Sequence, residues 1–312
     1  MTSGLQFSVV ICAHNPRPDY LGRVLAHLDA QTYPRDQWEL VLIDNLSAPP
    51  LSNQITEGIS LPLRIVREET PGLVAARARG MIETSGAWLV YVDDDNLLNP
   101  NYLEELQRLI LTHPHVALWS GEIRPEFEVQ PPNRTKPFWV YLAIREVEGT
   151  QWSNVAINHT LPCGAGMAMR REVMTNWVNG IKTDAMRSCL GRKGNSLLAG
   201  EDTDIGLTAY AMGLGVGISN TMRLVHLIAA RRIEDRYLRK IAYSVVYSHS
   251  LLDLVYRRVT FMGLLLRMAM FTRELFSRNR NMTGVTLWWA QVCGIASGWL
   301  RYKSLVKQRQ EV

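Results

Sequence analysis

The segment WLVYVDDDN, residues 88–96, places an apolar run directly before three consecutive aspartates, Asp93, Asp94 and Asp95. The apolar run predicts a buried β-strand. Because adjacent like charges repel, three carboxylates at the end of such a strand call for an explanation. An Asp-rich turn is one interpretation, since aspartate is common in turns. A cation site is the other, because Mg²⁺ and Mn²⁺ prefer carboxylate oxygens.

Strand and helix patterns alternate around this segment. Buried-strand patterns occupy residues 7–15, 38–45, 61–69 and 87–96, and helix patterns occupy residues 19–31, 72–84 and 99–114. This alternation predicts an α/β fold with a mostly parallel central sheet covered by helices. Ligands of such sheets lie beyond the carboxyl ends of the strands. We therefore expect Asn15, Asp44 and the three aspartates to converge in one crevice.

Composition indicates a folded protein, since 47% of the 312 residues are hydrophobic and 20% are charged. The four cysteines are scattered and form no CxxC pair: Cys12, Cys163, Cys189 and Cys293. This disfavours a zinc knuckle or a thioredoxin-like site and indicates a reducing compartment. Residues 1–15 lack a basic region and turn polar quickly, so we interpret them as a first strand rather than a signal peptide.

Charge is distributed unevenly along the chain, whose net charge is +5. Residues 223–312 hold 16 Lys+Arg and 5 Asp+Glu, a net of +11, which leaves −6 for residues 1–222. From about residue 231 the sequence changes to long helical patterns. We predict an α/β domain over residues 1–230 and a basic helical extension over residues 231–312. Nucleic acid or an anionic membrane would attract such an extension, and we expect the membrane and no nucleic acid.

Two apolar segments occur within this extension. Residues 259–271 carry Arg267 near their middle, which disfavours a membrane span. Residues 284–300 carry no charge over 17 positions, near the lower limit for a span. Because basic residues and tryptophans flank these segments, we expect helices that lie in a membrane interface. A helical cap packed on the domain and a dimer interface are the alternatives.

Two further motifs carry titratable side chains. In GEDTDIG, residues 200–206, a helix pattern begins at Glu201, Asp202 and Asp204. These acids can favour a helix start through the helix dipole, or one can act as a general base for a hydroxyl group. The strand-like segment MRLVHLI contains His226. This histidine is either a packed residue or a metal ligand through one imidazole nitrogen.

Taken together, five motifs resemble those of a known family. In order, they are SVVICAHNP, LVLIDNLS, GLVAARARG, WLVYVDDDN and GEDTDIGLTAY. Their order and spacing over about residues 7–230 are similar to those of family-two inverting glycosyltransferases with a GT-A fold. The resemblance therefore implies a GT-A-type nucleotide-sugar-binding domain, with a DXD-type metal motif in the aspartate run.

The resemblance also implies roles for individual residues. A nucleotide-sugar donor would be bound by Ala13, Asn15, Asp44, Arg77, Asp93 and Asp94. Asp202 would be the catalytic base, and Glu201 would orient it or the acceptor. Asp95 and His226 would hold Mn²⁺ or Mg²⁺.

One position departs from the family's pattern. Arg77 matches the family's arginine, which is usually followed by asparagine, but the next residue here is Ala78. The departure removes hydrogen bonds expected near the nucleotide, and we expect Arg79 to replace them in part.

The implied activity is metal-dependent, inverting transfer of a sugar from a nucleotide-sugar, expected to be UDP-linked, to a hydroxyl of a glycan or lipid-linked glycan. Surface polysaccharide biosynthesis and a cytoplasmic position, peripheral on the inner face of the cell membrane, would suit such an acceptor. A metal-dependent phosphohydrolase and a non-catalytic membrane-associated scaffold are the alternatives. A dinucleotide-dependent oxidoreductase and a P-loop nucleotidase are excluded, because the first strand precedes no GxGxxG turn and the chain has no GxxxxGK[ST] motif.

Overall fold

The computed structural model describes residues 4–52, 60–156, 159–184, 187, 190–194, 196–278 and 282–310. The chain divides into two compact units. The first consists of Met1–Glu126, Ile144–Ser188 and Glu201–Leu227, and the second of Phe127–Ala143, Cys189–Gly200 and Ile228–Val312. The chain passes between the two units more than once. The predicted domains, 1–230 and 231–312, stay a prediction.

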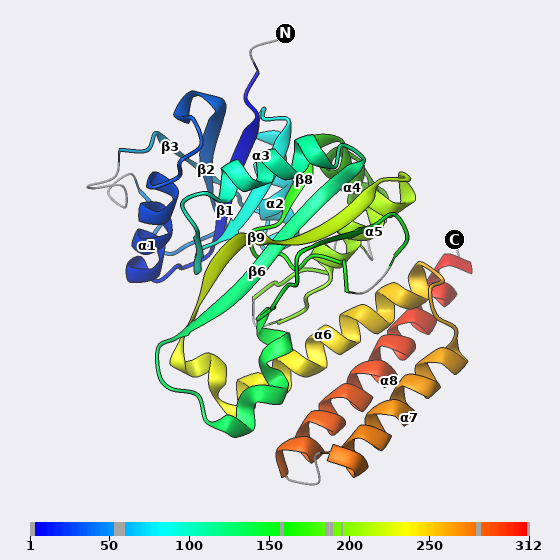
Figure 1. Ribbon diagram of the computed structural model, residues 1–312. Coiled ribbons are helices and arrows are strands. Elements are labelled where there is room, and N and C mark those ends of the chain that lie inside the picture. Colours follow the sequence, from blue (N-terminus) through cyan, green and yellow to red (C-terminus); the bar gives the residue numbers. More distant parts are fainter. Residues whose placement is uncertain are drawn as a thin grey trace. The chain divides into compact units, whose positions relative to one another are not determined.

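A nine-stranded sheet forms the centre of the first unit, in the order β3-β2-β1-β4-β8-β6-β9-β5 with β7 paired to β9 (Figure 1). The parallel part consists of β3 Leu63–Arg67, β2 Trp38–Asp44, β1 Phe7–Ala13 and β4 Trp88–Asp93. The other strands are β5 Asn96–Leu98, β6 Val116–Phe127, β7 Thr150–Ser153, β8 Ala168–Arg170 and β9 Gly215–Ile228. β8 is antiparallel to β4 and β6, and β9 is antiparallel to β5 and β7. The predicted α/β fold is confirmed, with an antiparallel part added to its parallel part.

The helices of the first unit cover this sheet. They are α1 Pro18–Asp29, η1 Arg35–Gln37, α2 Leu73–Ile82, α3 Tyr102–Thr112, α4 Arg171–Thr183 and α5 Glu201–Ala211. Apolar side chains of α2, α4 and α5 share one core with alternate residues of the strands. This core includes Val10, Leu89 and Tyr91 from the strands, Trp177 from α4 and Ile205 from α5. This packing fixes the start of α5 relative to the parallel strands.

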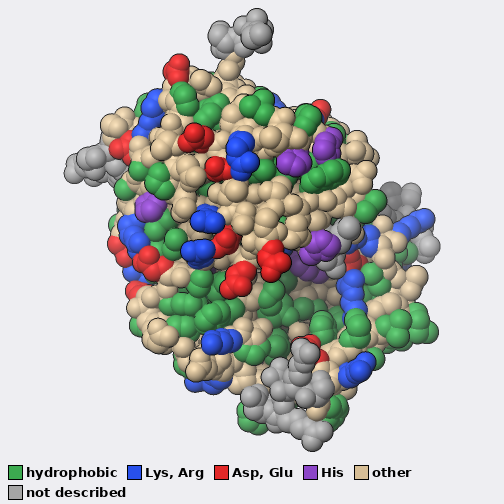
Figure 2. All heavy atoms as spheres, in the orientation of Figure 1, with side chains coloured by type: hydrophobic (Ala, Val, Ile, Leu, Met, Phe, Trp, Pro, Cys, Tyr) green, Lys and Arg blue, Asp and Glu red, His purple; other side chains and the backbone are tan. Residues whose placement is uncertain are grey.

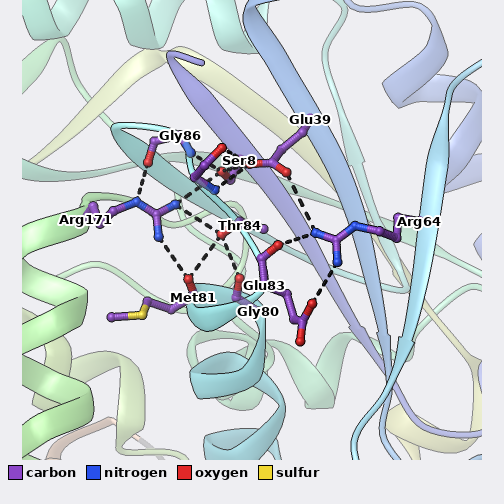
Figure 3. Close-up of polar contacts among 10 residues, drawn as sticks. Ser8, Glu39, Arg64, Gly80, Met81, Glu83, Thr84, Gly86 and Arg171 are labelled. Atoms are coloured by element: carbon purple, nitrogen blue, oxygen red, sulfur yellow. Dashed lines mark hydrogen bonds and ion pairs between the residues drawn. The ribbon is translucent and has the colours of Figure 1, made fainter. Parts of the chain in front are cut away.

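A polar network ties together the amino ends of the parallel strands (Figure 3). Arg171, at the start of α4, donates to Gly86 O at 2.6 Å and to Met81 O at 2.9 Å. Ser8 Oγ donates to Glu39 Oε1 at 2.8 Å and accepts from Gly86 N at 2.8 Å. Because ligands of parallel sheets bind at the opposite, carboxyl edge, we assign this network to stability.

The second unit contains η3 Asn133–Leu142, η5 Ala230–Ile233, α6 Asp235–Val255, α7 Phe261–Arg278 and α8 Met282–Gln310. α8 packs against α6 through two glycines. A Cβ atom at Gly294 would lie 2.9 Å from Tyr243 O, and one at Gly298 would lie 2.9 Å from Tyr247 O. The uncharged segment 284–300 therefore includes positions where two helix backbones touch. Among the described helices, none has both the length and the apolar character needed to cross a bilayer.

α7 packs on α6 and α8, and the side chain of Arg267 points toward α6. Leu264 of α7 is buried with Leu254 and Ile295. The buried carboxylate of Asp253 accepts from Arg267 Nη1 at 2.5 Å and pairs with Arg258 Nη1 at 3.1 Å. Arg267 therefore neutralises a buried acid on the inner side of α7.

A short segment before α5 is held on α6 within this unit. Ala199 N donates to Ser248 Oγ at 3.3 Å, and Ser248 Oγ donates to Ser244 O at 2.9 Å. A Cβ atom at Gly200 would lie 3.2 Å from Ser248 Cβ and from Leu252 Cδ1. The chain therefore leaves the surface of α6 at residue 200.

Candidate active site

Two aspartates flank the carboxyl end of β1, the central strand of the parallel part. The register places Ala13 beside Asp44 of β2 and Cys12 beside Asp93 of β4. The strand ends that the sequence predicts to converge therefore lie next to one another. This is the edge at which α/β sheets bind ligands.

The Asp44 carboxylate is buried and binds backbone groups of the loop that follows β2. It accepts hydrogen bonds from Ser47 N at 2.9 Å, Leu51 N at 3.1 Å and Arg67 Nη1 at 2.6 Å. Burial raises the pKa of Asp44, but the hydrogen bonds from Ser47, Arg67 and Leu51 outweigh burial and hold this pKa below its usual value. Asp44 is thus an ionised residue that orders the loop after β2, and its contact with a nucleotide stays a prediction.

Two asparagines join the loops at this edge. Asn15, in a left-handed backbone conformation (φ 48°), accepts from Ala48 N at 2.8 Å and donates from its own N–H to Ser47 Oγ at 2.9 Å. Asn45 forms three hydrogen bonds of 2.7–3.1 Å with backbone groups of residues 68–72. Asn45 was not among the residues predicted to form the site, although its place directly after a strand-end aspartate was an available signal.

Arg77 of α2 lies buried between the end of β4 and the start of α5. Its Nη1 lies 3.4 Å from Glu201 Oε1, and its Nη2 lies 4.0 Å from Asp93 Oδ1. Burial lowers the pKa of this guanidinium, but the charges of Glu201 and Asp93 more than compensate, so the pKa is raised and Arg77 stays charged. A Cβ atom at Gly164 would lie 2.4 Å from Nη2, so a larger residue there would collide with the guanidinium.

The neighbours of Arg77 lie in different surroundings. Ala78 packs against the apolar core of the first unit. Arg79 is partly exposed and forms ion pairs with Glu83 at 2.8 Å and Glu68 at 4.0 Å. Its partial replacement of the family's asparagine stays a prediction.

The first acids of α5 meet a glycine-containing loop. Asp202 Oδ2 accepts from Gly164 N at 2.8 Å, and Oδ1 accepts from Thr203 N at 2.7 Å. Glu201 is buried beside Arg77. Asp202 itself is only half-buried, so its carboxylate is held in place but remains accessible to a ligand. Gly164 was not predicted from the sequence, because a backbone N–H donor leaves no side-chain signature.

The third acid of the motif, Asp204, is structural. It is fully buried, and its Oδ2 accepts from Trp177 Nε1 at 2.7 Å and Arg187 Nε at 2.9 Å. Arg187 also donates to Thr208 Oγ1 at 2.8 Å. One motif thus provides an accessible carboxylate at Asp202 and a buried anchor for α5 at Asp204.

The aspartate run combines a strand end with a turn. Asp93 ends β4, and Asp94 and Asp95 form the turn to β5. Because Asn96 is paired with His226 across β5 and β9, His226 Nε2 lies 3.4 Å from Asp95 Oδ2. The structure therefore brings together the two residues predicted to hold a cation.

These two donors fit the chemistry of Mg²⁺ or Mn²⁺, with an oxygen and an imidazole nitrogen at one point. Within the described ranges, no group of three or more His, Cys, Asp or Glu side chains lies close enough to hold a metal ion. Such cations often take one or two protein ligands and complete their shell with substrate phosphates and water. The site therefore suits a cation that arrives with a phosphorylated ligand.

Two cysteines near these acids are poor nucleophiles. Burial raises the pKa of Cys12 to about 12, with Asp93 and Asp94 adding to the effect and Arg77 opposing it. Burial likewise raises the pKa of Cys163 to about 11. Because the thiolate is the reactive form, these residues do not supply a nucleophile at neutral pH. Both thiols and that of Cys293 are free, and Cys189 lies outside the described residues.

An open pocket of about 1000 Å³ borders the loop that carries Gly164. Its lining includes charged, amide and apolar side chains, among them Glu122, Arg124, Arg145, Glu148, Gln151 and Ile218. Arg145 donates from Nη1 to Leu161 O at 2.9 Å, which connects one wall of the pocket to that loop. Such a mixed lining suits a polar organic ligand.

Comparison with known proteins identifies the family. A sequence model of the family named Glycosyl transferase family 2 matches residues 8–177. The chain belongs to glycosyl transferase family 2. The matched region contains Asp44, Arg77 and the aspartate run, and the predicted resemblance is confirmed.

Family members with curated sequences match the chain over part of their length. Glycosyltransferase AglE of Haloferax volcanii is 31% identical over 108 residues, which is 33% of this chain and 35% of AglE. An uncharacterized glycosyltransferase of Haemophilus influenzae is 29% identical over 122 residues, 38% of this chain and 45% of that protein. The match thus spans less than half the length of these curated relatives.

Solved structures show the same fold at low sequence identity. S. aureus TarS matches with a TM-score of 0.53 at 15% identity, over 88% of this chain and 45% of TarS. A TarS fragment, residues 1–349, in complex with UDP matches with a TM-score of 0.50 at 15% identity, over 97% of this chain and 92% of the fragment. At this identity the likeness shows the fold alone.

Proposed function

We propose that this chain transfers a sugar from a nucleotide-sugar donor to an acceptor hydroxyl. The observation that carries the proposal is the link between the strand-end carboxylate of Asp93 and the start of α5. Asp93 lies beside β1, and Arg77 reaches from Asp93 to Glu201 directly before Asp202. A donor bound at the strand ends would therefore lie near an accessible carboxylate.

Asp202 is the proposed catalytic base. The acceptor oxygen would attack the anomeric carbon and pass its proton to Asp202, while the bond from that carbon to the diphosphate breaks. A single displacement of this kind inverts the anomeric centre and needs no nucleophile on the protein. The hydrogen bond from Gly164 N to Asp202 Oδ2 supports the proposal, because it orients the carboxylate. Glu201, held by Arg77, would fix the start of α5.

Donor binding is assigned to residues at the strand ends, namely Ala13, Asn15, Asp44, Arg77, Asp93 and Asp94. A UDP-linked donor is the first choice, since the TarS fragment that shares this fold is in complex with UDP. Asp95 and His226 would hold Mn²⁺ or Mg²⁺. When bound, the cation would neutralise charge that develops on the leaving diphosphate.

The proposed acceptor is a glycan or a lipid-linked glycan, in the assembly of a surface polysaccharide. The pocket lined by Arg145, Glu148 and Gln151 is the proposed acceptor site, because it borders the loop that orients Asp202. The proposed location is cytoplasmic and peripheral on the inner face of the cell membrane. The net charge of +11 in residues 223–312 supports attraction to anionic lipid.

The test is a screen of nucleotide-sugars with Mn²⁺ or Mg²⁺, which measures donor hydrolysis and transfer. Asp202→Asn keeps a hydrogen-bond acceptor for Gly164 N but removes the base, so turnover should fall by about 10²–10⁴-fold. UDP binding by calorimetry should persist. Asp36→Asn, at an exposed carboxylate in η1, is the matched control.

Three results would count against the proposal. Wild-type turnover in Asp202→Asn would remove this residue as the base. Release of phosphate from simple phosphate esters, with no transfer from any nucleotide-sugar, would favour a phosphohydrolase instead. Donor binding without any reaction would favour a non-catalytic scaffold.

A further inference from the structure

Exposed hydrophobic side chains are concentrated on the last two helices. Of the sixteen large hydrophobic side chains that are exposed in the described part of the chain, ten lie on α7 and α8. Single exposed hydrophobic residues are normal on protein surfaces, whereas contiguous apolar surface marks an interaction site. In Figure 2, hydrophobic and basic side chains lie side by side in the region that these helices form.

The outer face of α7 is an apolar stripe. Phe261, Met262, Leu265, Leu266, Met270 and Phe276 are between 40% and 63% exposed. From Met262 on, these positions follow the three- and four-residue spacing of one helix face. Arg273, also exposed, adds a positive charge to this face. Arg267 does not interrupt the stripe, because it pairs with Asp253 on the inner side.

α8 presents a second stripe that changes from apolar to basic along its length. Met282, Val285, Trp289 and Leu300 are exposed. Lys303 and Lys307, also exposed, continue at the same helical spacing. The opposite side of α8 is the side on which Gly298 contacts α6. The outer stripe is therefore not the face that packs the helix onto its own unit.

We propose that the outer stripes of α7 and α8 dock on the surface of an anionic lipid bilayer. A helix with one apolar face and basic residues lies in the plane of a membrane interface, with the apolar side chains among the lipids. The absence of a spanning helix among those described agrees with surface docking. This inference refines the proposed membrane location by naming the residues that make the contact.

Charge favours lipid over a second copy of this chain. The described, exposed basic residues of the two helices include Arg273, Arg301, Lys303 and Lys307, whereas Glu274 is an acid among them. Two copies that met through these stripes would bring two surfaces of net positive charge together, which like charges disfavour. Anionic headgroups supply the complementary charge.

The test measures co-sedimentation of the full chain with vesicles of phosphatidylcholine, alone or mixed with phosphatidylglycerol. Leu266→Glu/Met270→Glu should lower the partition coefficient on mixed vesicles by more than about tenfold. Lys303→Gln/Lys307→Gln should lower it by about fivefold per lysine at low salt, with little effect on neutral vesicles. Ile82→Glu/Leu111→Glu, which adds the same charge at exposed positions of α2 and α3, should bind like the wild type.

The outcomes separate lipid docking from misfolding and from dimerisation. Circular dichroism and thermal melts should show that each variant is folded. Absent wild-type binding to mixed vesicles, or unchanged binding of folded Leu266→Glu/Met270→Glu, would overturn the inference. A wild-type dimer that this variant converts to monomer, without vesicle binding, would assign the stripes to a second copy. Donor hydrolysis in vesicle-free solution tests the proposed transferase separately, and the variant should retain it.

Discussion

Arg77 and Glu201 form a buried ion pair between α2 and α5, with Nη1 3.4 Å from Oε1 and side-chain exposures of only 2% and 5%. Asp93 lies 4.0 Å from the same guanidinium. The pair therefore links the aspartate run to the start of the helix that carries Asp202. Because both charges are removed from water, removing one partner of the pair would leave a buried charge poorly compensated.

Removal of this arginine should destabilise the first unit. Arg77→Met removes the positive charge that pairs with the buried Glu201, which should lower the free energy of unfolding by about 3–5 kcal/mol in urea denaturation. Arg79→Met removes a partly exposed arginine of the same helix and should cost about 1 kcal/mol or less. Equal losses in the two variants would mean that the buried pair contributes no more than a surface pair.

The two aspartates of α5 should respond differently to the same change. Asp204→Asn weakens the buried contacts with Trp177 and Arg187, so the free energy of unfolding should fall by about 3 kcal/mol. Asp202→Asn retains an acceptor for Gly164 N and should unfold within about 1 kcal/mol of the wild type. Urea denaturation followed by tryptophan fluorescence measures both. If Asp202→Asn were the more destabilised variant, the structural role would belong to Asp202 and the chemical role to Asp204.

The pair of Asp95 and His226 should set the affinity for Mn²⁺. His226→Gln removes an imidazole nitrogen 3.4 Å from the carboxylate and should weaken Mn²⁺ binding by about 10–100-fold. Electron paramagnetic resonance of Mn²⁺ in the presence of UDP measures this without turnover. His159→Gln, at an exposed histidine, is the control. If both variants bind Mn²⁺ as the wild type does, the cation site lies elsewhere.

Two glycine-to-alanine changes should shift the free energy of unfolding in opposite directions. A Cβ atom at Gly298 would lie 2.9 Å from Tyr247 O, so Gly298→Ala forces α8 away from α6 and should cost about 1–3 kcal/mol. A Cβ atom at Gly22, within α1, would meet no atom within 4 Å. Gly22→Ala should therefore stabilise the chain by about 0.5–1 kcal/mol. Thermal melting of both variants checks the pair, and a stabilising Gly298→Ala would contradict the close backbone contact.

Asp44 should make stability depend on pH in the acid range. Its folded-state pKa lies below the usual value near 3.8, so its contribution is complete above that value and disappears as pH falls through the lower folded-state pKa. The difference in unfolding free energy between wild type and Asp44→Asn should therefore shrink between about pH 6 and pH 2.5. Urea denaturation at both pH values measures it. If the difference in unfolding free energy were the same at both pH values, the ionised form of Asp44 would contribute nothing to stability.

The sequence could predict the edge of the sheet at which the site lies. Apolar runs that alternate with helices define parallel strands, and the carboxyl ends of parallel strands meet, so Asp44 and Asp93 were expected together. The family resemblance named Asp202 as the base, but the local sequence pattern alone could not distinguish Asp202 from Asp204. Both belong to one acidic motif, and only their directions on α5 decide which is buried against Trp177.

Other features depend on contacts that leave no local pattern. The hydrogen bond from Gly164 uses a backbone N–H, which every residue other than proline has. The uncharged segment around Gly294 has the same hydropathy whether lipid or another helix covers it. Its contact with α6 follows from the small size of glycine, which lets two backbones approach. Arg267 likewise finds Asp253 only after α6 and α7 have folded together.

The point where Ala199 is held on α6 lies close to Asp202 along the chain. Ser248 holds Ala199, Gly200 rests on the same helix, and the next residue, Glu201, begins α5. No spare length of chain separates this anchor from the proposed base. Only two residues, Gly200 and Glu201, therefore separate the anchored Ala199 from the proposed base along the chain.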